Sequence, residues 1–286
     1  MNNTKPFPND TKKMFWKCGT CSHTLLYLLN REFGYQKEAE ERASDLLAGG
    51  IMNTGHQCGM LWGASLAVGA ESFRRFHDTA KATSIAITTT QHLLESFSKR
   101  TKTLNCREIT GCDLTSKYGL FKLSLITIFS GFINSPCFKL ADKWVPEAIE
   151  TATEGLSQEH LVTVLPPISC ASEVVRKMGG SDEEIIMVAG FAGGLGLSGN
   201  ACGALSAAIW MNILAWCRKN PGKIPPYFKN PATKNILHAF YSAAESEINC
   251  HKITGQSFKT IDEHSEFIKN GGCNTIINLL AESAIK

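Results

Sequence analysis

Apolar residues recur along most of this chain at the spacing of α-helices. Four leucines between positions 25 and 29 share one face of a helix that ends near Gly34. Residues 181–184, Ser-Asp-Glu-Glu, form a capping-box pattern before an apolar run, which marks the start of another helix. Further helices are expected over residues 57–76, 81–98, 140–152, 201–217, 233–247, 260–269 and 275–284. Strand signals are few, so the pattern predicts an all-α fold.

Two segments depart from the amphipathic pattern. Residues 36–45 are polar with helical propensity throughout, and the charges from Lys37 to Asp45 are expected to form a solvated helix face. Residues 185–216 contain no charged residue and are long enough to span a bilayer. However, glycines crowd their centre beside Ser198 and Asn200, which favours two buried helices joined by a glycine turn over a membrane span.

An internal repeat organises the chain. Residues 48–59, AGGIMNTGHQCG, align with residues 192–203, AGGLGLSGNACG, at an offset of 144 positions. The same offset places residues 105–111, NCREITG, on residues 249–255, NCHKITG. Two separate motifs in one register indicate a tandem duplication. We therefore expect two homologous helical units, residues 1–155 and 156–286, related by a pseudo-two-fold axis, with Pro166 and Pro167 in the linker around residues 162–168.

The repeat also pairs eight of the cysteines. Outside the shared register, Cys21 matches Cys170 at an offset of 149, and Cys137 matches Cys273 at an offset of 136. The first unit thus holds Cys21, Cys58, Cys106 and Cys137, and the second holds Cys170, Cys202, Cys250 and Cys273. Cys18, Cys112 and Cys217 each belong to one unit only.

Composition narrows the class of protein. A chain of 286 residues that is 43% hydrophobic and 19% charged can bury a large core, which excludes a disordered chain. A net charge of +3 without a basic stripe gives no reason to expect a nucleic-acid partner. The N-terminus lacks the apolar run of a secretory signal, so we expect a cytoplasmic protein. In that reducing compartment, 11 cysteines are more typical of metal ligands or redox thiols than of structural disulfides.

The position of the second cysteine in each unit favours such chemistry. Cys58 and Cys202 follow glycine turns and open predicted helices, where the helix N-terminus lowers the pKa of a thiol. Glycines let the backbone approach whatever the sulfur holds, and N–H donors in a dry surround suit an iron–sulfur sulfur. The candidate cofactor-binding glycines are Gly49, Gly50, Gly55, Gly59, Gly193, Gly194, Gly199 and Gly203. The third cysteine of each unit is expected in a turn closed by glycine.

At this point the residues resemble a known family. CGMLWG at 58–63 and CGALSA at 202–207 are similar to the CGAxxG motif of the C_GCAxxG_C_C family of redox-active proteins with four cysteines. The order of an early cysteine, a Gly-Gly turn, this motif, an Asn-Cys turn and a last cysteine also resembles the family, here as a tandem duplicate. Each copy departs from the motif once, at Met60 and at Ala207. A similar domain in split-Soret cytochrome c implies an iron–sulfur centre of the [2Fe–2S] type, with the eight repeated cysteines as ligands.

Spacing alone does not choose the metal, because tetrahedral sulfur sites suit zinc or copper as well as iron. A metal-free thiol–disulfide protein or sensor is the other alternative, with Cys18 and Cys21 as a candidate redox dithiol. We expect a redox carrier without substrate turnover of its own, which makes enzymatic activity an open question, and a redox partner protein. Association of identical chains is left open.

Some weaker sequence patterns are typical of other kinds of site. Too few residues precede Cys18 for a thioredoxin fold, and His23 lies one position too far for a CxxCH haem site. GxGxxG at 194–199 matches a dinucleotide-binding pattern, but a helix start rather than a strand precedes it. His56 and His251 lie beside repeated cysteines without counterparts in the other unit, so they are expected to tune a thiol or to be exposed rather than to bind metal.

Overall fold

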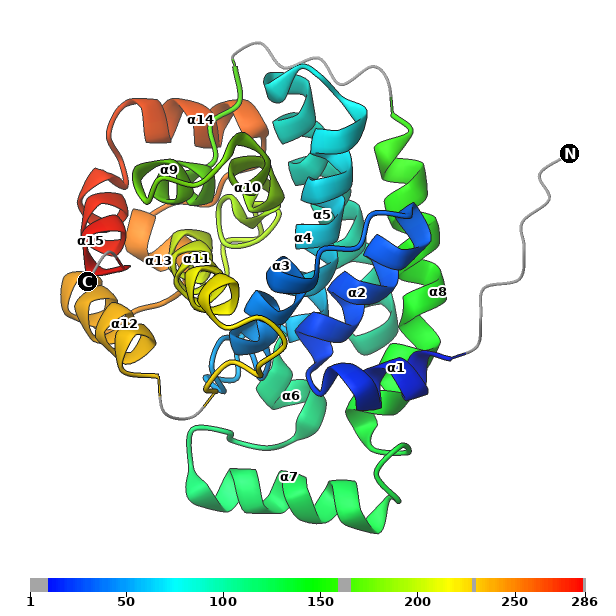
Figure 1. The fold of residues 1–286 in the computed structure, drawn as a ribbon. Coiled ribbons are helices and arrows are strands. Elements are labelled where there is room, and N and C mark those ends of the chain that lie inside the picture. Colours follow the sequence, from blue (N-terminus) through cyan, green and yellow to red (C-terminus); the bar gives the residue numbers. More distant parts are fainter. Residues whose placement is uncertain (1–9, 159–165, 228–229, 285–286) are drawn as a thin grey trace, which may run out of the picture.

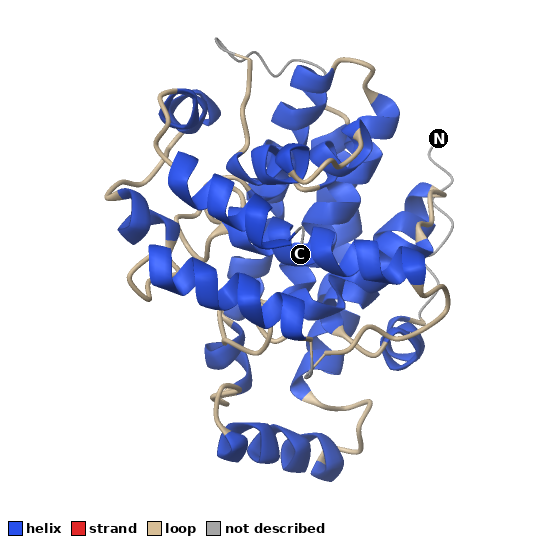
Figure 2. Cartoon of the chain, turned by 60° about the vertical axis from the view of Figure 1, so that its left-hand side comes forward, coloured by secondary structure: helices blue, strands red, loops and turns tan. Residues whose placement is uncertain are grey.

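The computed structural model describes residues 10–158, 166–227 and 230–284. Within these ranges the chain forms fifteen α-helices, two short 3-10 helices and no strand, apart from two isolated β-bridges (Figures 1 and 2). The predicted all-α fold is confirmed. Of the expected linker, residues 162–165 lie outside the described part, and Pro166, Pro167 and Ile168 form an irregular connection.

The helices follow the predicted pattern closely. The first unit contains α1 (Thr11–Cys18), α2 (Cys21–Phe33), α3 (Glu38–Ala43), the 3-10 helix η1 (Ser44–Leu47), α4 (Gly59–Arg75), α5 (Thr79–Thr101), α6 (Cys106–Thr110), α7 (Lys117–Phe129) and α8 (Pro136–Leu156). The second contains α9 (Cys170–Lys177), α10 (Asp182–Met187), the 3-10 helix η2 (Ala189–Phe191), α11 (Gly203–Lys219), α12 (Pro231–Ala243), α13 (Cys250–Thr254), α14 (Ile261–Lys269) and α15 (Asn274–Ala284).

Local signals set most helix ends. The Thr20 side chain caps α2, and Gly34 ends it in the left-handed conformation. The capping box of Ser181 and Glu184 is present at the start of α10. The expected helix over 233–247 stops earlier, at Ala243, because left-handed backbone at Glu245 and Ser246 breaks the helical path.

The repeat is visible in the backbone hydrogen bonds. Gln57 pairs with Asn105 in one isolated bridge, and Ala201 pairs with Asn249 in the other, at the same offset of 144 positions. The amide of Cys58 donates to Leu104, and that of Cys202 donates to Ile248, both at 2.8 Å. Each bridge ties the start of the helix after the glycine turn to the turn before the third cysteine. The motif that the sequence repeats is therefore a repeated structural unit.

The two units pack by exchanging elements around one hydrophobic core. Helices α3 and η1 of the first unit contact α11 of the second, while α10 and η2 of the second contact α4 of the first. The close approach of α10 needs Gly69 in α4, since a Cβ there would lie 2.5 Å from the carbonyl oxygen of Ile186. Trp62 and Phe191 meet edge to face at 4.7 Å in the shared core. This reciprocal exchange is the arrangement expected of units related by a pseudo-two-fold axis.

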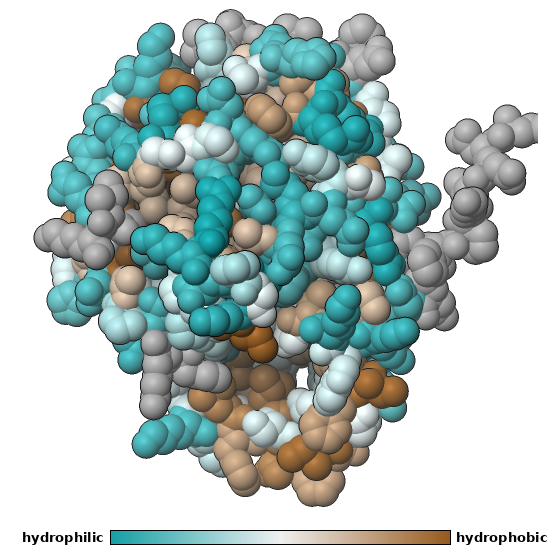
Figure 3. All heavy atoms as spheres, in the orientation of Figure 1, coloured by the Kyte–Doolittle hydropathy of each residue, from teal (hydrophilic) through white to brown (hydrophobic). Residues whose placement is uncertain are grey.

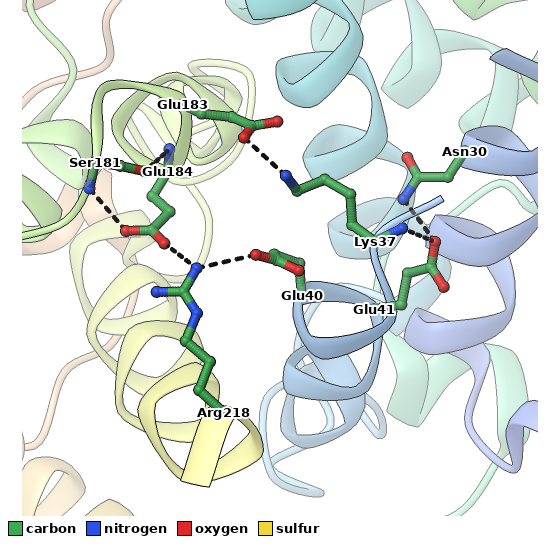
Figure 4. A network of polar contacts seen from close by, with 8 residues as sticks. All are labelled: Asn30, Lys37, Glu40, Glu41, Ser181, Glu183, Glu184 and Arg218. Carbon is green, nitrogen blue, oxygen red and sulfur yellow. Dashed lines mark hydrogen bonds and ion pairs between the residues drawn. The ribbon is translucent and has the colours of Figure 1, made fainter. Parts of the chain in front are cut away.

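The charged segment before the first glycine turn lies at this interface, and the expectation of a solvated helix face is wrong. Glu41 is 3% exposed and accepts a hydrogen bond from Asn30 at 2.9 Å. Lys37 forms an ion pair with Glu183 at 2.7 Å, and Arg218 lies between Glu40 and Glu184 (Figure 4). Since Glu183, Glu184 and Arg218 come from the second unit, the charge run serves as a contact between units. Sequence periodicity cannot show this, because the partners lie far along the chain.

Helix α7 differs from the rest of the fold. It lies apart from the main body, at the lower end of the molecule in Figure 1, and hydrophobic residues gather there in Figure 3. Tyr118 is 76% exposed and Phe129 is 84% exposed, and Gly119 is the one buried residue of the helix. The sequence pattern does not predict α7, since its apolar residues do not follow a one-sided helical pattern.

Residues 185–216 form α10, η2, the glycine turn and most of α11, as the sequence predicted. No helix in the described part of the chain is long and apolar enough to cross a membrane. The uncharged stretch is buried in the core between the two units instead.

Candidate redox site

The repeated cysteines occupy equivalent positions at helix starts. Cys21 and Cys170 are the first residues of α2 and α9, and Cys58 and Cys202 precede the first residues of α4 and α11. Cys106 and Cys250 open α6 and α13, where a turn was expected, and glycines close both short helices. Cys137 lies in the first turn of α8, and Cys273 directly precedes α15. Helix starts supply free N–H groups to all these positions.

The glycine turns before Cys58 and Cys202 adopt an unusual conformation. Five successive residues, 49–53 in one unit and 193–197 in the other, have positive φ. Such a conformation costs about 1–2 kcal/mol at each residue that carries a Cβ, so the glycines ease it. A Cβ at Gly50 would lie 2.3 Å from the amide nitrogen of His56, and one at Gly194 would lie 2.5 Å from the carbonyl oxygen of Asn200. These glycines are thus required by the turn itself.

The turn directs N–H groups toward the first cysteine of its unit. The amide of Gly49 donates to the sulfur of Cys21, together with the amides of Ser22 and Cys21. The amides of Gly193 and Ala171 act in the same way on Cys170. The repeated backbone therefore brings one amide of the turn, together with amides of a helix start, to one thiol in each unit.

All four cysteines of the first unit line one cavity of about 400 Å³. Its walls are mainly apolar and include Phe15, Met60, and Leu120 and Leu123 of α7. Gly59 lets Cys21 approach, since a Cβ at this position would lie 2.6 Å from the Cys21 sulfur. The cysteines that the sequence assigned to one set are thus brought together around a common space.

Cys21 and Cys58 form a directly interacting pair within this cavity. A hydrogen bond from Cys58, aided by the backbone amides, lowers the pKa of Cys21 even though the thiol is buried. The same hydrogen bond and burial raise the pKa of Cys58 well above its ordinary value. Within the pair, deprotonation is therefore favoured at Cys21 and disfavoured at Cys58.

The other six repeated cysteines behave differently. Burial raises the pKa of Cys137 and of Cys202 to about 12, and it also raises those of Cys106, Cys170, Cys250 and Cys273. Cys170 also contributes to raising the pKa of the other three cysteines of its unit, Cys202, Cys250 and Cys273. The expected low pKa at Cys58 and Cys202 is wrong, because the hydrogen bond with Cys21, followed by burial, raises the pKa of Cys58, and burial raises that of Cys202. The lowered pKa belongs to Cys21 instead.

The remaining predicted site residues lie around these sets. Gly55 and Gly199 allow Arg107 and His251 to pack close to the turn, and Gly203 lies against the carbonyl of Phe191. His251 is exposed, with its Nδ1 2.6 Å from the carbonyl oxygen of Gly199. Burial and, to a lesser degree, Arg107 lower the pKa of His56. The GxGxxG segment is part of the left-handed turn and follows helices, so it lacks the strand of a dinucleotide site.

The structure separates Cys18 from Cys21. Cys21 faces the four-cysteine cavity, whereas Cys18 and His23 line a second cavity of about 620 Å³. Asp45 and Cys18 raise the pKa of His23 against the effect of burial. The two cysteines of the candidate dithiol thus have different partners.

One residue of the first site, Tyr227, was not predicted from the sequence. Tyr227, from the second unit, lines the cavity, and its hydroxyl lies 3.0 Å from both Ala48 O and Asn53 Oδ1. Burial, followed by the nearby Cys21, raises the pKa of Tyr227. No pattern around Tyr227 marks it, because only the exchange between units brings it to the turn. The first site is therefore completed by the second unit.

The side chains of the first site can be compared with those that a single metal ion or an iron–sulfur cluster requires. In the described part of the chain, no three His, Cys, Asp or Glu side chains converge closely enough to hold a single metal ion. Four thiols spread around a mainly apolar cavity, with N–H donors at one sulfur, fit a polynuclear cluster better, since its ligands bind different metal atoms. The residues thus fit an iron–sulfur cluster.

The fold and the site together define a helical protein in which one structural unit with four cysteines occurs twice. The family model described as "Putative redox-active protein (C_GCAxxG_C_C)" matches residues 19–127 and 169–286. The chain belongs to this family and carries its unit twice. No curated protein and no solved structure matches the chain.

Proposed function

We propose that this protein is an electron carrier whose first four-cysteine site binds an iron–sulfur cluster, with [2Fe–2S] the favoured type. The observation that carries the proposal is the single apolar cavity lined by Cys21, Cys58, Cys106 and Cys137. A bound cluster supplies one-electron transfer without proton chemistry at a substrate. This role also agrees with the redox character of the family.

The chain's own residues prepare the site for such a group. The amides of Gly49 and Ser22 donate to the Cys21 sulfur, and donors of this kind stabilise added negative charge at a cluster. Leu120, Leu123 and Phe15 give the cavity apolar walls. Both hydrogen bonding and solvent access are known to set the reduction potential of such centres. A redox partner protein would take the electron at the molecular surface.

The hydrogen bond between Cys21 and Cys58 favours one other function, that of a thiol–disulfide redox protein. The Cys21 thiolate and the Cys58 thiol would form a disulfide and release two electrons and one proton to an external acceptor. This chemistry needs only two of the four cysteines. The two functions therefore differ in their need for Cys106 and Cys137.

Anaerobic purification of the full chain, with iron and sulfide analysis, visible absorption and EPR of the reduced protein, tests the cluster. We expect Cys106→Ser and Cys58→Ser each to remove the first-site cluster signal. Cys217→Ala, a buried cysteine outside both repeated sets, is the matched control and should retain it. A wild-type protein free of iron overturns the proposal. If Cys58→Ser then abolishes reversible thiol oxidation and Cys106→Ser does not, the dithiol function replaces it.

A further inference from the structure

Helix α7 carries apolar side chains on both its inner and its outer side. On the inner side, Leu120 and Leu123 line the cysteine cavity. On the outer side, Tyr118, Phe121 and Phe129 are exposed. Large apolar side chains that gather on one exposed surface indicate an interaction site. The outer side of α7 is therefore a candidate for contact with a partner.

The exposed apolar surface continues beyond the helix. The ring of Trp16, in α1, meets that of Phe132 edge to face, with the ring centres 6.0 Å apart. Eight large hydrophobic side chains are exposed in the described part of the chain, and all but Ile224 lie here. We call this surface the α7 patch, and its members are Trp16, Tyr118, Phe121, Ile128, Phe129, Phe132 and Ile133. Hydrophobic residues gather at this end of the molecule in Figure 3.

The fold of the repeated unit does not require the α7 patch. The equivalent helix of the second unit, α14, begins 144 positions after α7. In α14, Asp262 and Ser265 stand at the positions of Tyr118 and Phe121. The exposed rings thus belong to the first unit alone, which indicates a role other than folding.

Positive charge accompanies the patch. Residues 114–141 contain no Asp or Glu and three exposed lysines, Lys117, Lys122 and Lys139. None of the three has a carboxylate partner within the described ranges. On one side of this segment Asp113 already pairs with Arg107, and on the other Asp142 already pairs with Lys12. The charge favours an occupant with negative groups, whereas a second copy of this chain would bring the same lysines.

The lysines lie beside the exposed rings. Three exposed aromatic residues each have an exposed lysine next to them in the sequence, namely Trp16 with Lys17, Lys117 with Tyr118, and Phe121 with Lys122. The Nζ atom of Lys122 also donates to the carbonyl oxygen of Gly111 at 2.8 Å. Cores of protein–protein interfaces are depleted in lysine, whereas aromatic rings with lysines beside them are typical of helices at a bilayer surface. The composition of the patch therefore favours lipid over protein.

The position of α7 suits a flat surface. In Figures 1 and 2, which differ by a turn of 60°, α7 is the outermost element at its end of the molecule. The other helices lie on one side of it in both views. The helix can therefore lie along a plane without a collision between that plane and the main body.

We propose that the α7 patch binds the surface of a lipid bilayer that contains anionic lipids. The exposed rings enter the boundary between headgroups and acyl chains, and the lysines lie near the lipid phosphates. Helix α7 then lies parallel to the membrane, while Leu120 and Leu123 still cover the cysteine cavity. This inference goes beyond electron transfer and does not depend on a bound cluster.

Co-sedimentation of the full chain with vesicles measures the binding. We expect the wild type to bind phosphatidylcholine vesicles that contain about one-third phosphatidylserine, and to bind pure phosphatidylcholine at least about tenfold more weakly. High salt should weaken binding to the anionic vesicles. These comparisons need no variant, so a folding defect cannot affect them. No binding to anionic vesicles, or equal binding to both kinds, overturns the proposal.

One substitution made at two isoleucines locates the contact. Ile128→Ser lies inside the patch and should weaken binding about tenfold, because this side chain no longer leaves water on binding. Ile224→Ser, at the exposed isoleucine outside the patch, is the matched control and should bind as the wild type does. Equal affinities of the two variants contradict the assignment to α7. A dimer in analytical ultracentrifugation that Ile128→Ser alone dissociates would assign the patch to a second copy and overturn the proposal.

The charges are tested in the same way. A double variant, Lys117→Gln with Lys122→Gln, should bind anionic vesicles about tenfold or more weakly than the wild type. Lys269→Gln is the control, since Lys269 is exposed in α14 at the opposite end of the molecule from α7 (Figure 1). If the double variant retains full affinity, or if Lys269→Gln weakens binding as much, the lysines of α7 do not contact the lipid and the proposal fails.

Discussion

In the first unit Cys58 donates a hydrogen bond to Cys21, whereas in the second unit burial dominates both Cys170 and Cys202 and raises both pKa values. The backbones of the two sites are nevertheless alike, with the same left-handed turn and the same amide donor, Gly49 or Gly193. The turn alone thus does not set the chemistry of the thiol. The two sites differ in how closely the second cysteine, Cys58 or Cys202, interacts with the first cysteine of its unit, and in the residues around it.

The glycine after each second cysteine offers the sharpest comparison of the two sites. A Cβ at Gly203 would lie 1.8 Å from the carbonyl oxygen of Phe191, while one at Gly59 would lie 2.6 Å from the Cys21 sulfur. A buried backbone carbonyl yields less readily than a side chain. We therefore expect Gly203→Ala to lower the free energy of unfolding by about 3 kcal/mol or more, and Gly59→Ala by about 1–2 kcal/mol.

Urea unfolding followed by circular dichroism measures both changes. Gly59→Ala should in addition alter the rate at which Cys21 is alkylated, because its methyl group displaces that sulfur. Equal losses of stability in the two variants would show that the contact of Gly203 with Phe191 relaxes as easily as that of Gly59 with Cys21. The two helix starts would then be equivalent in packing as well as in backbone.

The second unit should also make the free energy of unfolding sensitive to acid pH, whereas the first unit has no equivalent histidine. His264 in α14 is almost fully buried, and burial lowers its pKa from 6.5 to about 4, whereas Leu120 stands at the equivalent position in α7. As the pH falls below 6.5, the imidazole of His264 binds a proton in the unfolded chain but stays neutral in the folded chain. Stability present above pH 6.5 is therefore lost down to about pH 4, by up to about 3 kcal/mol.

Unfolding free energies of wild type and His264→Leu across this pH range test the assignment. The wild type should lose stability as the pH falls from 6.5 to about 4, and His264→Leu should lose about 3 kcal/mol less over the same interval. His77→Leu, at an exposed histidine, serves as the control and should follow the wild type. Identical pH profiles for His264→Leu and wild type would place the acid sensitivity elsewhere.

The one departure of the second motif from CGAxxG has a packing reason. A Cβ at Gly63 would lie 2.1 Å from the carbonyl oxygen of Ser22, so α2 and α4 touch at this glycine. Ala207 occupies the equivalent position in α11 and is fully buried, which shows that α9 and α11 leave room for a methyl group. Gly63→Ala should cost about 2 kcal/mol through overpacking, and Ala207→Gly about 1 kcal/mol through helix propensity and a small void. Equal costs, measured by thermal unfolding, would contradict this difference in helix spacing.

The sequence predicted much of this molecule because its main signals are local. The cap at Ser181, the stop at Gly34 and the repeated glycine turn all act within a few residues, and each is found where it was expected. The grouping of four cysteines per unit followed from the register of the repeat, and the cavity joins the first set. Because the unit is duplicated, its pattern occurs twice in the sequence, and each copy supports the prediction made from the other.

What the sequence did not predict depends on contacts between distant segments. Tyr227 reaches the first site only because the units exchange elements, and Lys37 and Glu40 of the charged segment find ion-pair partners in Glu183 and Arg218 of the second unit. The lowered pKa of Cys21 arises from Cys58, which lies 37 positions away in the sequence. Helix α7 was missed for a different reason, since a helix that is apolar on all sides shows no periodic stripe.

The smallest effects should separate α7 from α14, which begin 144 positions apart in the same register. Phe121 of α7 is 59% exposed, whereas Ser265, at the equivalent position of α14, is 2% exposed and accepts a hydrogen bond from the amide of Ile168 at 2.9 Å. Ser265→Ala leaves this N–H without its acceptor and should cost about 1–2 kcal/mol. Phe121→Ser removes an exposed side chain and should change stability by less than about 0.5 kcal/mol.

Paired urea titrations of these two variants decide the point, because both alter a single side chain at one register position of the repeat. A cost above about 1 kcal/mol for Phe121→Ser would mean that α7 is anchored to the body through this ring, in spite of its exposure. The expected result, a loss for Ser265→Ala alone, would show that equivalent helices have diverged in role. In the second unit the helix holds the connection at Ile168, while in the first α7 supplies Leu120 and Leu123 to the wall of the cysteine cavity.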